Sequence, residues 1–303
     1  MMRPEMVRYR QKQDRMQEFG LALQSGGRLL FRDISPENGF RLDRFAALTG
    51  AAVDGSSGGE QPDVILAIGQ EPPPGGICLG VWEREIRLYW LPEQGIFRLQ
   101  IKNPLSPDEI SRRQVRCWQL AAIGAVIAAI LRGRKILLVH GALLDAPRGA
   151  ILLCGQSGMG KSTTSRRWRE AGGAVYADDM MLLEFADSTI ITHPLPTWSR
   201  CLESLEGEFF PFSRAVPLTR VIALARGSEE ELKAVPRNEF LASLYNACIF
   251  FSAWIGKRMP DEARKTLVGA IQSRTLEMMQ IFPPTGLFAN LEAELGETLR
   301  EFR

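Results

Sequence analysis

The first third of the chain alternates between short apolar runs and turn-forming stretches. Segments rich in glycine and proline, such as 54–59 and 71–76, separate the runs. The runs have the length and composition of β-strands and cover residues 28–32, 63–68, 77–91 and 95–101. The pattern predicts a small α+β or mostly β domain over residues 1–105. No catalytic motif occurs there, so substrate binding and assembly both stay open as its role.

One long apolar run follows, from Leu120 to Leu131. A membrane span needs about 20 apolar residues, and this run is much shorter. Turn and capping residues precede it at 106–109, and Gly133 follows it. We therefore predict a core helix whose small residues pack closely against a sheet.

The rest of the chain alternates between strand-like and helix-like segments, which is typical of an α/β domain. We expect this domain to cover residues 106–303. The expected strands are 135–139, 150–154, 174–177, 180–183, 221–225 and 279–282, and the expected helices are 163–171, 240–254 and 261–279.

A phosphate-binding loop is the clearest chemical signal. The sequence after the strand 150–154 fits G-x-x-x-x-G-K-[ST] at every fixed position. Its glycines let the backbone turn tightly, and the helix that follows presents its positive end to a phosphate. Lys161 is expected to reach the β- and γ-phosphates, and the Ser162 hydroxyl to ligate Mg²⁺. The expected nucleotide-binding residues are Gly155, Gln156, Ser157, Gly158, Met159, Gly160, Lys161, Ser162 and Thr163.

Two adjacent carboxylates, Asp178 and Asp179, follow the strand 174–177. One could bind Mg²⁺, and the other could take a proton from an attacking hydroxyl. The alternative is an ordinary strand-ending turn, where Asp is common. The later strand 221–225 ends in Arg226 rather than in the metal-binding Asp of ordinary phosphate-loop ATPases. Asp179 is therefore the candidate metal ligand.

His140 closes the strand 135–139, which precedes the phosphate-loop strand. A lone histidine at a strand end is more often structural than catalytic. The sequence V-H-G-x-L-x-D begins one residue before His140 and ends at Asp145.

These three motifs, V-H-G-x-L-x-D, G-x-S-G-x-G-K-S and x-A-D-D, together resemble HPr kinase/phosphorylase and its relatives over about residues 135–185. The resemblance implies a P-loop catalytic domain with the fold of HPr kinase and phosphoenolpyruvate carboxykinase. It also implies transfer of phosphate from a nucleotide to a serine hydroxyl. Position by position, Lys161 would contact phosphate, Ser162 and Asp179 would hold Mg²⁺, Asp178 would be the base, and His140 would lie beside the reacting groups.

The sequence differs from true HPr kinases at two places. Thr163 stands where HPr kinases have Glu, and their later Glu-Val-Arg-Gly-like signature is missing; the nearest segment is 200–206. HPr is therefore not the expected substrate. The chain is more similar to related kinases encoded beside peptide-modification genes, including lasso-peptide kinases and the SynChlorMet cassette type, ScmC.

Composition agrees with an enzyme of the cytoplasm. The chain has 303 residues, 45% of them hydrophobic, and a net charge of +2, which excludes a strong field for nucleic acid. Five cysteines lack metal-ligand spacing and are expected to be reduced thiols. The first residues form no apolar signal region, and we expect no membrane partner.

The sequence therefore predicts a kinase that uses ATP or GTP with Mg²⁺, with a serine or threonine of a peptide or protein as acceptor. Trp198 and Arg200, in an expected loop from 192, are candidate acceptor contacts. A kinase for a small molecule such as serine or a polyol is one alternative. A regulatory module that binds or hydrolyses nucleotide is another. Self-association of the chain stays open.

Overall fold

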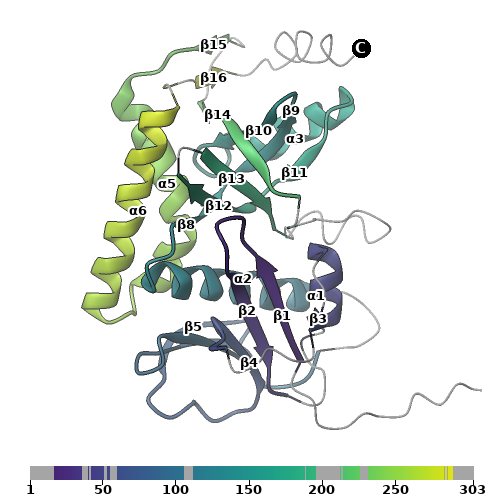
Figure 1. Cartoon of the computed structure of the whole chain (residues 1–303), viewed down its shortest axis with the longest axis vertical. Helices are drawn as coiled ribbons and strands as arrows, with labels where there is room; N and C mark the ends of the chain where they lie inside the picture. Colours follow the sequence, from purple (N-terminus) through teal and green to yellow (C-terminus); the bar gives the residue numbers. More distant parts are fainter. Residues whose placement is uncertain are drawn as a thin grey trace, which may run out of the picture.

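Two mixed β-sheets, with one long helix between them, form the part of the chain that the computed structural model describes (Figure 1). The described residues are 17–35, 40, 42–50, 53–54, 60–105, 112–187, 189–195, 212, 214–225, 231–282, 284 and 286–288.

The first sheet has seven strands within the described residues, in the order β3-β1-β2-β4-β7-β6-β5. Strands β2, β4 and β7 are parallel neighbours, and the other pairs are antiparallel. The elements are β1 (Gln17–Ala22), β2 (Arg28–Asp33), α1 (Leu42–Thr49), β3 (Val53–Asp54), β4 (Val64–Ile68), β5 (Ile77–Trp82), β6 (Ile86–Leu91) and β7 (Ile96–Ile101).

The expected strand over 77–91 is instead a hairpin of β5 and β6. Glu83 and Arg84 both adopt left-handed backbone conformations, with φ of 50° and 62°. Two left-handed residues make the tight turn that matches the twist of an antiparallel pair, but such turns usually carry Asn or Gly. The Glu-Arg turn therefore gave no signal in the sequence. Strands β1 and β3 and helix α1 were also not predicted.

Helix α2 (Arg112–Leu131) confirms the predicted core helix. It packs on β7, β2 and β4 of the first sheet and on β8 of the second. An added Cβ at Gly124 would lie only 3.1 Å from Cβ of Phe97, so glycine permits the close approach of α2 to β7. Among the described helices, α2 and α5 are long and apolar enough for a membrane span, but 89% of the apolar stretch of α2 is buried inside the protein.

The second sheet follows α2 in the sequence. Its described strands run in the order β11-β9-β10-β14-β13-β12-β8, with β16 beside β14 and β15 beside β16. Strands β10 and β14 are parallel neighbours near its centre. The elements are β8 (Ile136–His140), β9 (Ala142–Ala146), β10 (Gly149–Cys154), α3 (Lys161–Glu170), β11 (Val175–Ala177), β12 (Met180–Ala186), β13 (Thr189–Pro194), β14 (Val216–Leu224), β15 (Glu231–Lys233) and β16 (Gly286–Phe288).

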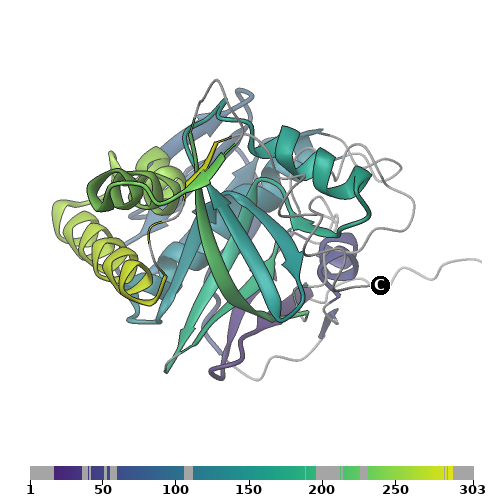
Figure 2. The same cartoon turned by 90° about the horizontal axis from the view of Figure 1, so that it is seen from above.

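Helices α5 (Arg237–Gly256) and α6 (Asp261–Ile281) lie side by side along one flank of the molecule (Figures 1 and 2). The expected last strand over 279–282 is wrong, because α6 continues to Ile281. Its buried residues recur at helical spacing, and Phe282 N–H still donates to the carbonyl of Met278 at 2.9 Å.

The expected loop from 192 is also partly wrong. Thr192, His193 and Pro194 belong to β13, while Trp198 and Arg200 lie outside the described residues.

One hydrophobic core joins the two sheets. Its buried side chains extend without a break from Phe19 in β1 to Phe282 after α6, and the residues of α2 connect the two halves. The four described cysteines are free thiols, and three of them, Cys117, Cys154 and Cys248, are buried in this core. Burial raises the pKa of Cys154 and of Cys248 to about 12.

Candidate functional site

The loop that runs from Gly155 to Gly160 joins β10 to α3, so the predicted strand and helix flank it. The helix begins at Lys161, two residues earlier than expected. Gly158 and Gly160 adopt left-handed conformations with φ of 80° and 99°, which side chains disfavour. Gly160 caps α3, and the unbonded N–H groups of the first helical turn face the loop.

Lys161 folds back over this loop. Its side-chain Nζ donates to the carbonyl oxygens of Gly155 at 2.8 Å and of Gln156 at 3.2 Å. Burial lowers the pKa of Lys161, and the nearby Cys154 and Asp179 offset part of that effect. A buried cation at a helix N-terminus gives this end of the loop a strong preference for an anion.

The two predicted carboxylates lie in the bend between β11 and β12. Strand β11 ends at Ala177 and β12 begins at Met180, so Asp178 and Asp179 are at the strand end, as predicted. Asp178 is buried, and Asp179 is half-buried. The antiparallel register of β12 and β8 sets Met180 opposite His140, which brings His140 beside Asp179.

His140 and Gln119 hold the Asp179 carboxylate from two sides. His140 Nδ1 lies 3.1 Å from Oδ1 of Asp179 and 3.1 Å from its carbonyl oxygen. Gln119 Nε2 donates to Oδ2 of Asp179 at 3.4 Å. The Gly141 N–H also donates to the Asp179 carbonyl at 3.2 Å. These contacts fix both the backbone and the carboxylate of Asp179.

The imidazole of His140 also stacks on Phe250 of α5, with ring centroids 4.1 Å apart and planes inclined by 19°. Phe251 meets the same imidazole edge-on at 5.7 Å. Aromatic packing therefore holds the ring plane while Nδ1 faces Asp179.

Two adjoining cavities open at this point. One, of about 360 Å³, is lined by the loop residues Ser157, Gly158, Gly160, Lys161, Ser162 and Thr163 and by His140, Asp178 and Asp179. The other, of about 320 Å³, is lined by Arg116, Gln119, His140, Ser157, Ser162, Asp178, Asp179, Phe250, Phe251 and Trp254. We call them the loop cavity and the aromatic cavity.

Three of the nine expected nucleotide-binding residues line neither cavity. Gly155 is buried, and its carbonyl bonds Lys161. Gln156 is exposed, and its carbonyl also accepts from Lys161. Met159 packs against a small apolar cluster around β9, β10 and α3. These three residues therefore contribute to the position of Lys161 or to the packing of the loop rather than to a cavity wall.

The donor set suits a hard cation that is completed by other oxygen ligands. Within the described part of the chain, no group of three or more His, Cys, Asp or Glu side chains could hold a metal by itself. Ser162, Asp178 and Asp179 nevertheless line the same two cavities. Mg²⁺ commonly takes only one or two protein carboxylates and binds phosphate oxygens and water for the rest. The residues present therefore fit Mg²⁺ bound together with a nucleotide.

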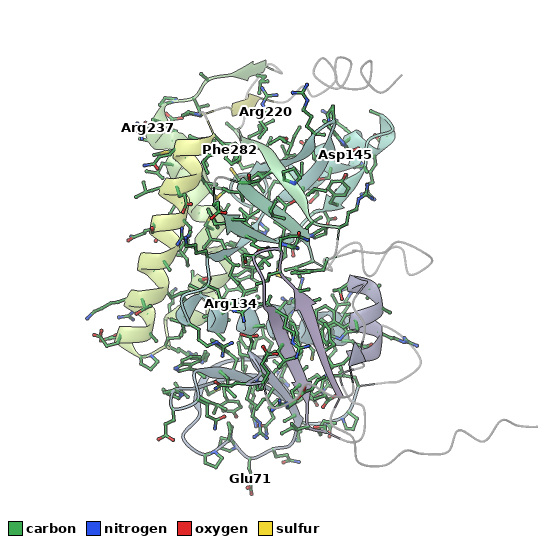
Figure 3. The ribbon with its side chains drawn as sticks, in the orientation of Figure 1. Glu71, Arg134, Asp145, Arg220, Arg237 and Phe282 are labelled. Carbon is green, nitrogen blue, oxygen red and sulfur yellow. The ribbon has the colours of Figure 1, made fainter. Side chains whose placement is uncertain are left out.

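Asp145, the last residue of V-H-G-x-L-x-D, makes structural hydrogen bonds next to the phosphate loop. Figure 3 shows it in the upper half of the molecule, near α3. Its Oδ1 accepts from Nε1 of Trp168 in α3 at 2.6 Å and from the Ala174 N–H at 2.8 Å. One carboxylate therefore ties the loop helix to the segment that leads into β11 and the two aspartates.

Sequence reasoning missed the residues that the long helices bring to the site. Arg116 and Gln119 come from α2, and Phe250, Phe251 and Trp254 come from α5. Gln119 left one usable signal in the sequence, because it is a polar residue between Trp118 and the apolar run that begins at Leu120; the structure shows that it is buried. The aromatic residues of α5 left none, since aromatic residues at helical spacing usually belong to a core.

Comparison with known proteins places the chain in a family. A search of curated proteins finds no match. Among solved structures, the Hpr(Ser) kinase/phosphatase from Coxiella burnetii aligns with 10% identity and a TM-score of 0.27, over 55% of this chain and 95% of that one. The profile of the family described as SynChlorMet cassette protein ScmC matches residues 107–298, which is more than half of the chain. The chain therefore belongs to the ScmC family.

Proposed function

We propose that this protein is a Mg²⁺-dependent kinase that transfers the γ-phosphate of ATP or GTP to a serine or threonine hydroxyl of a peptide or protein. One observation carries the proposal: the phosphate-binding loop, the paired aspartates and His140 line the same cavity. An ordinary strand-ending turn would not require two carboxylates to face a phosphate loop.

The loop cavity supplies the phosphate-binding part of this reaction. Lys161 and the N–H groups at the start of α3 provide positive charge for the phosphate oxygens. Lys161 Nζ now bonds two carbonyl oxygens of its own loop, and a phosphate oxygen would be a stronger acceptor. Ser162 and Asp179 would hold Mg²⁺, which when bound would neutralise part of the negative charge of the phosphates.

The contacts of Asp179 support the division of roles between the two aspartates. His140 and Gln119 engage both carboxylate oxygens of Asp179, as is common for a metal ligand that is oriented by its neighbours. Asp178 is then the proposed base. The acceptor oxygen forms a bond to the γ-phosphorus as the bond to the β–γ bridging oxygen breaks, and the hydroxyl proton passes to Asp178.

The test combines nucleotide binding with acceptor labelling. Calorimetry with ATP or GTP and Mg²⁺ should give a binding isotherm. Labelled nucleotide should then be offered with a panel of serine- and threonine-containing peptides, HPr, free serine and inositol. We expect label on at least one peptide and none with Lys161→Ala.

Three outcomes separate the alternatives. Absence of nucleotide binding by the folded protein would refute the whole proposal. Nucleotide binding with labelling of free serine or inositol alone would mean a small-molecule kinase. Binding with release of inorganic phosphate, and with no labelled acceptor, would mean a nucleotide-hydrolysing module.

A further inference from the structure

The aromatic cavity shares five residues with the loop cavity, and the shared residues include the proposed base, Asp178, and the proposed metal ligands, Ser162 and Asp179. Both cavities are lined by His140, Ser157, Ser162, Asp178 and Asp179. The proposed base and metal ligands therefore lie where the two cavities meet. A reaction that joins two molecules at one phosphorus atom needs such an arrangement, because each reactant must reach the same point from a different side.

The unshared residues identify which reactant each cavity suits. Gly158, Gly160, Lys161 and Thr163 line only the loop cavity, and these are phosphate-binding positions of the loop motif. The residues that line only the aromatic cavity come from the helices α2 and α5 and not from the phosphate loop. The loop cavity therefore suits the nucleotide phosphates, and the aromatic cavity is left for the group that accepts the phosphate.

Two polar side chains from α2 line the aromatic cavity and connect to Asp179. Arg116 Nη1 donates to Oε1 of Gln119 at 3.5 Å, and Gln119 in turn donates to Asp179. This chain of side chains positions the proposed metal ligand.

The opposite wall is aromatic and partly open. Phe250 and Phe251 lie 5.3 and 5.9 Å from Trp254, measured between ring centroids. Trp254 is 42% exposed, although most large apolar side chains of this protein are buried. An exposed Trp beside a cavity can bury apolar surface only when a ligand covers it.

We propose that the aromatic cavity binds the acceptor and takes an apolar or aromatic side chain next to the serine or threonine that receives the phosphate. This inference rests on the proposed kinase function. The hydroxyl residue would reach Asp178, while its neighbour packs on Trp254 and Phe250. Trp254 is then a specificity-determining residue, and peptides are preferred to free serine or inositol because only a peptide covers the aromatic wall.

The test uses short peptides that are identical except for the residue beside a single serine, which is Phe, Leu, Ala or Asp. With the full-length wild-type protein, we expect kcat/KM for the Phe or Leu peptide to exceed that for the Asp peptide by roughly tenfold or more, as for loss of one aromatic anchor. Trp254→Ala should remove most of this preference by raising KM for the apolar peptides, while the nucleotide affinity measured by calorimetry stays the same. Trp254→Phe should retain the preference, because it keeps an aromatic ring.

Leu276→Ala is the matched control. Leu276 is an exposed apolar residue of α6, at 46%, and lines neither cavity. Its substitution should leave the order of the four peptides unchanged.

Each outcome bears on one claim. Equal labelling of the four peptides, or a preference that survives Trp254→Ala, would overturn the acceptor pocket and leave the kinase proposal standing. If the wild-type protein binds nucleotide but labels no peptide of this set, HPr, free serine or inositol, the kinase proposal fails and the acceptor pocket with it.

Discussion

Glu184 offers a sharp test of how the two sheets are held together. Its side chain is 1% exposed and lies in β12, in the second sheet. Its Oε2 accepts from the Gln24 N–H at 2.9 Å and faces Nε2 of His193 at 2.8 Å, and its Oε1 accepts from the Ser25 N–H. Gln24 and Ser25 form the turn between β1 and β2, so one carboxylate connects the hairpin tip of the first sheet to the second. Figure 1 shows this hairpin extending towards β12 and β13.

We expect Glu184→Ala to destabilise the protein by about 3–5 kcal/mol, because three groups lose their contact with one buried carboxylate and a hydrogen bond to a charged group contributes about 1.5–3 kcal/mol. The buried ring of His193 would lose its partner, which costs about 1–3 kcal/mol on its own. The two N–H groups of the turn would lose theirs as well, although water can reach the exposed turn residues. Glu184→Gln keeps one carbonyl acceptor and should cost less, about 1–3 kcal/mol.

The effect should depend on pH. Burial by itself raises the pKa of Glu184, but hydrogen bonds from Ser25, Gln24 and His193 outweigh burial, and the pKa in the folded protein lies below its usual value. The carboxylate therefore stabilises the fold fully above the unfolded pKa of about 4.3. This stabilisation is lost as the pH falls through the lower folded pKa, so the difference in stability between the wild-type protein and Glu184→Ala should shrink in acid.

Urea unfolding followed by tryptophan fluorescence, at pH 7 and at a series of acidic pH values, measures both effects. Glu262→Ala is the control, because that side chain is 87% exposed in a surface ion pair with Lys265 and should change stability by less than about 0.5 kcal/mol. A loss below about 1 kcal/mol for Glu184→Ala at pH 7, or a loss that does not shrink in acid, would refute the reasoning.

Three further predictions concern the site. Lys161→Ala should sharply weaken nucleotide binding and turnover, with an unfolding midpoint close to that of the wild-type protein. Unchanged nucleotide affinity by calorimetry would contradict the role of Lys161 in binding phosphate. Asp179→Asn should raise the Mg²⁺ concentration needed for half-maximal labelling, whereas Asp178→Asn should lower turnover by roughly 10²–10⁴-fold and spare nucleotide binding; equal loss of nucleotide affinity in both variants would contradict the division of roles. Asp145→Ala should cost about 1–3 kcal/mol and reduce nucleotide affinity, because Trp168 and the Ala174 N–H lose their acceptor; full retention of both would show that Asp145 does not support the loop.

Local patterns in the sequence were enough to predict many of the helices and strands. The strands around 28–32, 63–68 and 95–101, the core helix and the strand–loop–helix at 150–170 were predicted because each has its own period or motif. The errors arose where tertiary contacts decide the outcome. The Glu83–Arg84 turn lacks the usual turn residues, and the apolar end of α6 resembles a strand until its helical spacing of buried residues is seen.

The sequence by itself determined the phosphate loop, because the chemistry of the loop depends on a short spacing within one segment of chain. The two aspartates became candidates through their place after a strand, and the histidine through the resemblance of the motifs to those of HPr kinase. A glycine turn, a helix N-terminus and a lysine need only be adjacent in sequence to form an anion site. Only the tertiary structure decided what faces that site. At the site, Gln119 contacts Asp179 across 60 positions of sequence. Between the two sheets, Gln24 contacts Glu184 across 160 positions. The aromatic wall likewise comes from α5, which follows the loop by a long stretch of chain. Sequence spacing does not encode such distant pairs, since they form only when the packing of α2 and α5 between and beside the sheets sets their relative positions.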